Sequence, residues 1–186
     1  MNNKFSSYSD EQLVSFISHK GSETEPAFNE IYIRYSPLVH AYCVRISDNR
    51  DKAEDIFQET FIRFFNNVRT EENTNISGYL IKIARNLCLN EKRNLKSNIP
   101  AEELESLLFE TNDYETIEML ELIKMALELI EFDYREAFVL KEYDRMTYEE
   151  ISEICGITVA NVKSRVFRAK QKIKDILAPY IKEYVK

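Results

Sequence analysis

The stretch TYEEISEICGITVANVKSRVFRAKQKIK, residues 147–174, carries the strongest structural signal in this chain. Thr147 is followed three residues later by Glu150, a capping box that marks the start of a helix. Apolar residues then recur at helical spacing until Gly156, which supplies a sharp turn, and Thr158 caps a second helix. Two helices joined by a short turn containing glycine form a helix-turn-helix, and we expect this motif here.

The second helix of this motif has one apolar and one cationic side. Its inner positions are Val159, Val162, Val166, Ala169 and Ile173. The opposite side, again at steps of three and four, carries Asn161, Ser164, Arg165, Arg168 and Lys172. A major groove admits an α-helix, where Arg pairs with guanine and Asn with adenine. The flanking lysines suit phosphates, which add affinity without sequence information: Lys163, Lys170 and Lys174. This pattern predicts DNA binding.

The composition favours an all-α protein. With three glycines and four prolines in 186 residues, the chain has little material for the tight turns of a many-stranded fold. No apolar run approaches the roughly 20 residues that span a bilayer. Residues 1–10 are polar and lack an apolar signal core. We therefore expect no membrane insertion and a cytoplasmic location.

The cysteines and histidines give no sign of a metal site. Cys43, Cys88 and Cys155 are widely spaced and form no CxxC or Cys/His pattern. We interpret all three as small core residues. His19 and His40 have no neighbouring ligand partner. The sequence therefore predicts neither a metal nor a cofactor.

The charge is unevenly distributed along the chain. Its 25 basic and 32 acidic residues give a net charge of −7. Residues 101–121 hold eight acids and no base, whereas 156–174 hold six bases and no acid. Residues 82–96 hold five bases and one acid. Two basic segments separated by an acidic connector suggest two polyanion-binding surfaces, although solvated helix faces would look the same.

The first half reads as a bundle of amphipathic helices. We expect helices from about 10 to 17, from 26 to 37, at 38–46, at 52–66 and at 79–96, with Pro37 as an interruption and a polar loop at 69–78. The second helix is expected to bury Phe28, Ile31, Tyr32 and Tyr35.

Two of these helices have clear polar faces. The 52–66 helix has an apolar stripe of Ala53, Ile56, Phe57, Phe61, Phe64 and Phe65. Its outer face carries Glu54, Asp55, Gln58 and Glu59. The 79–96 helix is expected to bury Leu80, Ile83, Ala84 and Leu87, and to leave outside Lys82, Arg85, Asn86, Asn90 and Arg93.

The whole pattern predicts two small helical domains joined by an acidic flexible linker. The first domain is residues 1–97 and the linker is 98–116. The second domain, 117–186, begins with helices at 117–129 and 134–143 and continues into the helix-turn-helix.

Three stretches in this order resemble a bacterial extracytoplasmic-function (ECF) RNA polymerase sigma factor of the sigma-70 family. The stretch 51–61, DKAEDIFQETF, resembles the helix of sigma domain 2 that binds core polymerase. The stretch 78–86, GYLIKIARN, is similar to the helix that melts and reads the −10 element. The stretches 148–152 and 161–169 resemble the helix-turn-helix of sigma domain 4, which reads the −35 element.

The resemblance implies roles for particular residues. The polymerase-binding set, which would dock on the clamp helices of the largest catalytic subunit, is Asp55, Gln58, Glu59 and Arg63. The loop at 69–78 would accept a flipped base, and the −10 DNA-binding set is Asn75, Tyr79, Lys82, Arg85, Asn86 and Arg93. The −35 DNA-binding set is Thr158, Asn161, Lys163, Ser164, Arg165 and Arg168.

The same resemblance implies the partners and the activity. The partners are core RNA polymerase and promoter DNA, with an anti-sigma factor as a further candidate. The chain would be a promoter-specificity subunit and not an enzyme, because the catalysis belongs to the polymerase.

The sequence departs from the family pattern at four places. Asn161 stands where a Thr is common at the start of the recognition helix. Tyr79 stands where the family often has Trp, and it can still stack on a base through a smaller ring. Ile130-Glu131 replaces the usual Leu-Pro, which allows the helix that follows to join its predecessor. Arg145 replaces the usual Gly before the helix-turn-helix. These departures bear on turn geometry and base preference.

Two other classes of protein remain open on the residues alone. A stand-alone helix-turn-helix regulator would bind duplex DNA as a dimer, but it leaves 26–97 unexplained and no dimerisation heptads are evident. A helical enzyme would use carboxylates such as Asp51, Glu54 and Asp55. No nucleophile set, nucleotide loop or ligand cluster accompanies them.

Overall fold

The computed structural model describes residues 4–47, 49–68, 75–96 and 115–181, and within these ranges every regular element is helical. The elements are η1 (Lys4–Ser7), α1 (Asp10–Ser18), α2 (Thr24–Ile46), α3 (Arg50–Asn67), α4 (Ile76–Lys96), α5 (Glu115–Leu129), α6 (Phe132–Phe138), η2 (Val139–Tyr143), α7 (Tyr148–Cys155) and α8 (Val159–Ile181). The all-α prediction is confirmed. Residues 69–74 of the predicted loop and 98–114 of the predicted linker lie outside the described residues, and 115–116 belong to α5.

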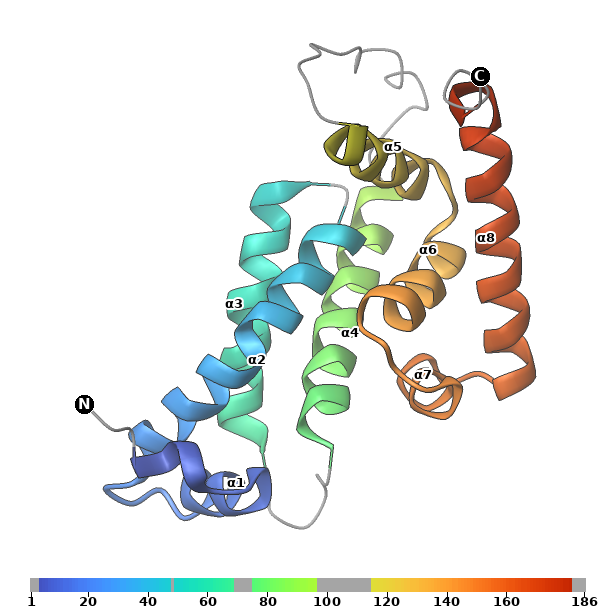
Figure 1. Cartoon of the computed structure of the whole chain (residues 1–186). Coiled ribbons are helices and arrows are strands. Elements are labelled where there is room, and N and C mark those ends of the chain that lie inside the picture. The colour runs from blue at the N-terminus through green and yellow to red at the C-terminus, as the bar shows by residue number, and fades with distance from the viewer. Residues whose placement is uncertain (1–3, 48, 69–74, 97–114, 182–186) are drawn as a thin grey trace.

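The first domain is a bundle in which α2, α3 and α4 pack side by side and α1 packs on α2 (Figure 1). Its centre is formed by fully buried side chains that include Tyr42, Phe64 and Leu80. None of the described helices is long and apolar enough to cross a membrane.

The predicted interruption at Pro37 is wrong, because α2 continues through it from Thr24 to Ile46. A proline inside a helix removes one backbone hydrogen bond and costs about 3 kcal/mol. Burial on both sides of the proline offsets this cost, since Ile31 before it and Val39 and Tyr42 after it are fully buried. A local helix breaker is thus overruled by tertiary packing.

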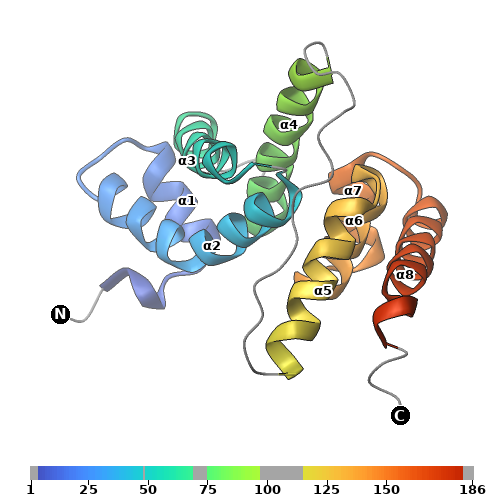
Figure 2. The same cartoon turned by 90° about the horizontal axis from the view of Figure 1, so that it is seen from above.

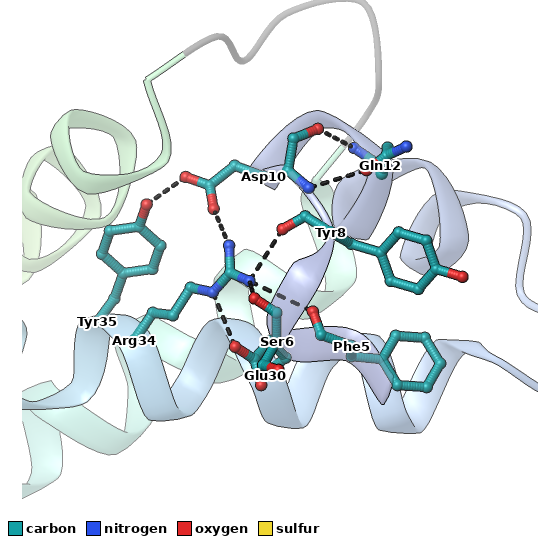
Figure 3. Close-up of polar contacts among 9 residues, drawn as sticks. Phe5, Ser6, Tyr8, Asp10, Gln12, Glu30, Arg34 and Tyr35 are labelled. Carbon is teal, nitrogen blue, oxygen red and sulfur yellow. Dashed lines mark hydrogen bonds and ion pairs between the residues drawn. The ribbon is translucent and has the colours of Figure 1, made fainter. Parts of the chain in front are cut away.

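Arg34 fastens the N-terminal segment to α2, as Figure 3 shows. Its Nε lies 2.9 Å from Glu30 Oε1, and its Nη1 lies 2.9 Å from Asp10 Oδ1. The Tyr35 hydroxyl donates to the other oxygen of Asp10. Arg34 Nη2 also donates to the carbonyl oxygens of Phe5, Ser6 and Tyr8. Through Nη1 and Nη2 this one guanidinium joins η1 and α1 to the bundle.

The second domain is built around α8, which packs against α5, α6 and α7. Ala169 and Ile173 of α8 lie in one buried cluster with Leu122 and Ala126 of α5. α5 and α6 are separate helices with a break at 130–131, so the helices do not join where Leu-Pro is replaced. Arg145 adopts φ +55°, the left-handed conformation that the usual Gly would adopt with less strain.

The two domains pack on each other, and Figures 1 and 2 both place α4 beside α7. At the centre of this contact the side chain of Glu136, on α6, is fully buried. Its Oε1 lies 2.9 Å from Arg85 Nε on α4 and accepts a hydrogen bond of 2.9 Å from the Tyr42 hydroxyl on α2. Burial raises the pKa of Glu136, and the charge of Arg85 opposes that shift.

The cysteines are core residues, as predicted, with Cys43 and Cys88 buried and Cys155 half-buried. Burial raises the pKa of the Cys155 thiol to about 12 and raises that of Cys43 as well. Thiols with such values carry almost no thiolate at neutral pH and are therefore poor nucleophiles.

Asp144, at the end of η2, has a carboxyl group in a buried environment that disfavours its charged form. Its Oδ2 is buried and has no hydrogen-bond partner among the described residues. Burial raises the pKa of this carboxyl to about 6, an effect that Arg45 of α2 only partly opposes. Because the folded protein disfavours the charged form, the contribution of Asp144 to stability falls as pH rises from about 4 to about 6.

Replacing this carboxylate with a neutral amide should therefore stabilise the protein. We expect Asp144→Asn to raise the free energy of unfolding at pH 7.5 by about 1–3 kcal/mol, since each unit of pKa shift corresponds to about 1.4 kcal/mol. The gain should disappear near pH 4, where Asp144 is already protonated in the folded protein. Urea unfolding across this pH range measures both effects. An equal change at every pH would contradict the assignment.

Candidate nucleic-acid and polymerase interfaces

The helix-turn-helix forms as the capping residues predict. Thr147 Oγ1 accepts from the Glu150 backbone N–H at 3.2 Å, and Glu150 Oε2 accepts from the Thr147 N–H at 2.8 Å. Gly156 ends α7 in the left-handed conformation with φ +67°. Thr158 Oγ1 then accepts from the Asn161 N–H at 3.2 Å and caps α8. Thr158, predicted to contact the −35 element, therefore has a structural role at the start of the recognition helix.

The outer face of α8 is exposed and cationic. Four predicted −35 residues are exposed on it: Asn161, Lys163, Ser164 and Arg168. Phe167 lies on the same face and is 63% exposed, the highest value among the large hydrophobic side chains described. Phe167 was not among the predicted −35 residues, although it does not fit the buried apolar set of α8, and this misfit could have identified it. An exposed aromatic among cations is suited to apolar contact with a DNA base or sugar.

Acidic residues at the start of α6 already pair with part of this face. Arg165 is only 24% exposed and its Nη2 lies 3.0 Å from Asp133 Oδ2. Lys172 Nζ lies 3.0 Å from Glu131 Oε1, at the residue just before α6. Arg165 must exchange its carboxylate partner for DNA if it is to read a base.

On α4, the predicted −10 residues fall into two groups. Lys82, Asn86 and Arg93 are exposed, as expected. Arg85 was predicted to lie outside, and this is wrong, because its side chain is 13% exposed and pairs with Glu136 across the domain contact. Helical periodicity cannot detect a second domain that covers a polar position.

Asn75 and Tyr79 are held at the start of α4. Asn75 Oδ1 accepts from the Gly78 N–H at 2.9 Å and so caps the helix. A Cβ at position 78 would lie 3.1 Å from the Asn75 side chain, which makes a glycine suitable there. Asn75 Nδ2 donates to Glu150 of α7 at 3.3 Å. The Tyr79 ring is half-buried, with its centroid 6.0 Å from that of Phe64.

A cleft of about 720 Å³ brings predicted −10 and −35 residues together. Its walls come from α4, from the start of α6 and from α8: Leu89, Lys92, Arg93, Glu131, Phe132, Asp133, Tyr134, Asn161, Ser164, Arg165 and Arg168. Arg93, from the −10 set, therefore shares one cleft with four residues of the −35 set.

The outer face of α3 carries the predicted polymerase-binding set. Asp55, Gln58 and Arg63 are exposed, and Arg63 Nε lies 2.7 Å from Glu59 Oε1. Ile62, one turn along, is 54% exposed. A face that combines acid, amide and apolar groups differs from a solvated helix surface.

Aromatic side chains extend this face onto α2. Tyr32 and Phe65, both predicted to be buried, are exposed. The Phe65 ring packs edge-on against Phe28 at 5.0 Å, and Tyr32 packs against Phe61 at 4.9 Å. We call Tyr32, Ile62 and Phe65 the apolar patch of the first domain. The patch was not predicted, because Tyr32 and Phe65 fit the apolar stripes of their helices and Ile62 was assigned to neither face. Helical period alone does not decide burial, which depends on the neighbouring helices.

Comparison with known families matches both domains. Residues 31–98 match the model of sigma-70 region 2, and residues 120–173 match that of sigma-70 region 4.

Curated relatives extend these matches. The ECF RNA polymerase sigma factor EcfG of Rhodopseudomonas palustris is 31% identical over 148 residues, covering 76% of this chain and 80% of the relative. SigM of Bacillus subtilis is 29% identical over 152 residues, covering 80% and 93%. SigE of Mycolicibacterium smegmatis is 29% identical over 165 residues and covers 85% of this chain, which in turn spans 64% of that longer protein.

Solved structures show the same fold. The sigma factor RpoE of Bartonella quintana, solved in complex with the anti-sigma factor NepR, aligns with a TM-score of 0.69 at 27% identity over 81% of this chain and 96% of that one. CnrH, solved with the cytosolic domain of CnrY, aligns with a TM-score of 0.67 at 18% identity over 91% and 97%.

Region 2 and region 4 thus occur here in the family's order, the first with α3 and α4 and the second with the helix-turn-helix. The chain belongs to the extracytoplasmic-function sigma factors of the sigma-70 family, the non-catalytic subunits with which RNA polymerase initiates transcription.

Proposed function

We propose that this sigma factor binds core RNA polymerase through α3, reads the −35 element through α8 and traps the melted −10 element along α4. The observation that carries the proposal is the exposed cationic face of α8, supported on a capped helix-turn-helix. The domain division at 1–97, 98–116 and 117–186 is part of the proposal, and the family matches at 31–98 and 120–173 support it.

The α3 face supports a protein contact. Asp55, Gln58 and Glu59 offer acceptors to a basic partner surface, and the apolar patch beside them offers area to bury. We propose the clamp helices of the largest polymerase subunit as that surface. An anti-sigma factor is a second partner for the same patch, because RpoE, a relative in fold and sequence, was solved with one. Binding to polymerase implies a cytoplasmic location.

The two DNA-reading helices would act on different states of the promoter. α8 would enter the major groove of the −35 duplex, with Arg168 and Asn161 facing bases and Lys163 facing phosphate. On α4, Lys82, Asn86 and Arg93 would hold the single strand and Tyr79 would stack on a base. Tyr79 must leave part of its contact with Phe64 to do so.

Binding to polymerase is tested by removing the polar groups of α3. We expect Asp55→Ala/Gln58→Ala/Glu59→Ala to weaken binding to bacterial core RNA polymerase roughly tenfold or more, because three hydrogen-bonding groups are lost from the interface. Titration of labelled protein with core polymerase, with size-exclusion co-elution as a second readout, measures the change.

A control with the same chemistry is available elsewhere in the chain. Glu128, Gln171 and Asp175 are the same three residue types, exposed on α5 and α8. Their triple alanine variant should bind polymerase like the native chain. Equal losses in the two variants would contradict a specific role for α3. Tight binding to duplex DNA with no polymerase binding by the native chain would indicate a stand-alone regulator.

Reading of the −35 element is tested by comparing two cations of α8. A promoter is first selected from a library with randomised −35 and −10 elements by the native chain and core polymerase. Arg168→Ala should then reduce discrimination between this −35 element and its single-base variants by about 1–3 kcal/mol at one position. Lys170→Ala should weaken binding to all variants alike. It should also reduce the slope of the logarithm of the binding constant against the logarithm of salt concentration by about one, the loss expected for one phosphate contact. Unchanged discrimination with Arg168→Ala would assign Arg168 to the phosphates instead.

A further inference from the structure

The first turn of α4 carries Tyr79, the ring proposed to stack on a −10 base, and Asn75 closes this turn. Asn75 Oδ1 accepts the Gly78 N–H at 2.9 Å and the Ser77 hydroxyl at 2.8 Å. The Asn75 carbonyl oxygen accepts the Tyr79 N–H at 3.0 Å. The first N–H groups of a helix have no partner within the helix, so a side chain that accepts one of them fixes the turn. Asn75 therefore fixes the backbone that carries the Tyr79 ring.

The polar groups of the Asn75 side chain are occupied by the protein itself. An amide oxygen has two lone pairs, and Ser77 and Gly78 donate to both. The amide nitrogen donates to Glu150 Oε1 at 3.3 Å. A bidentate contact of asparagine with adenine uses the oxygen and the nitrogen together. Asn75 could make such a contact only by giving up the cap of α4.

The glycine at position 78 belongs to the same arrangement. A Cβ at this position would lie 3.1 Å from Cγ and Nδ2 of Asn75 and 3.3 Å from its Oδ1. Glycine is a poorer helix residue than alanine, and Gly78 does not adopt the positive φ that would require a glycine. The clearance that Gly78 gives to the capping amide accounts for a glycine in this turn.

The Tyr79 ring lies between the core and the surface. It is half-buried, and its centroid is 6.0 Å from that of Phe64. Ile76 and Leu80, in the same part of α4, are buried at 1% and 0% exposure. The direction of the ring therefore depends on the backbone of the first turn. If this turn frays, the affinity for a stacked base falls with the fraction of molecules in which the ring is in place.

We propose that Asn75 is a positioning residue for −10 reading: it caps α4 in the clearance left by Gly78 and so orients Tyr79 toward the base, without contacting the DNA itself. The inference rests on the proposed role of α4 at the −10 element. It assigns base discrimination to the cap and the ring together, whereas a direct contact would assign it to the Asn75 amide.

The first test compares two side chains that both lack the amide. Asn75→Ser keeps a favoured capping acceptor, whereas Asn75→Ala removes the cap. With core polymerase and the selected promoter, we expect Asn75→Ser to discriminate among single-base −10 variants within about twofold of the native chain. Asn75→Ala should lose roughly fivefold or more. Quenching of 2-aminopurine, placed in turn at each −10 position of the non-template strand, measures stacking and should follow the same order.

A matched control removes a cap of the same kind from another helix. Asn49 Oδ1 accepts the Lys52 N–H at 3.0 Å and caps α3. Asn49→Ala should lower the midpoint of urea unfolding about as much as Asn75→Ala does, because both lose one cap. Its −10 discrimination should nevertheless stay native, and −35 discrimination should be native in every variant. This comparison separates a loss of stability from a loss of positioning.

The second test uses the short contact at position 78. Gly78→Ala should push the capping amide aside and reduce −10 discrimination and stacking roughly two- to threefold. In Asn75→Ser/Gly78→Ala no amide nitrogen meets the added methyl group, so this double variant should discriminate like Asn75→Ser alone. An equal effect of Gly78→Ala in both backgrounds would remove the Asn75–Gly78 clearance from the mechanism.

Two further results would overturn the inference. Equal losses in Asn75→Ser and Asn75→Ala would assign Asn75 to a direct base contact through its amide. Native discrimination by Asn75→Ala would show that the cap does not position Tyr79. Native stacking and discrimination by Tyr79→Ala would instead reject the proposed role of Tyr79 itself, whatever Asn75 does.

Discussion

The buried carboxylate of Glu136 is the constraint on which the domain arrangement depends. A carboxylate with no exposed surface must be paired, and both of its charged or hydroxyl partners across the contact, Arg85 and Tyr42, belong to the first domain. Removing the charged partner Arg85 while the domains stay packed costs about 3–5 kcal/mol, because it leaves a buried charge without a counter-charge. The same interaction therefore specifies how the two domains pack.

The ion pairs around the recognition helix are of a different kind. Asp133 with Arg165 and Glu131 with Lys172 are pairs in which the carboxylates are largely exposed, and such pairs contribute about 0–1 kcal/mol. DNA phosphates can replace these carboxylates at little cost. The fold thus combines a strongly specified contact at Glu136 with weak contacts on α8, so that the cations of α8 remain available to DNA.

Local signals predicted the helix-turn-helix well, because Thr147, Glu150 and Gly156 act through their own backbone neighbours. Long-range features could not be predicted in this way. Pro37 was expected to end a helix that burial on both sides keeps intact. Arg85 was placed outside because helical periodicity describes one helix and contains no information about Glu136, fifty-one residues away in the sequence. The cap at Asn75 was likewise hidden in what reads as a polar loop.

The apolar patch of the first domain shows that the helical period of apolar residues does not reveal which of them remain exposed for a partner. Ile62 and Phe65 of α3 remain exposed although other apolar residues of this helix form its buried side. Large apolar groups left exposed beside an acid–amide face favour a protein partner over a solvated surface.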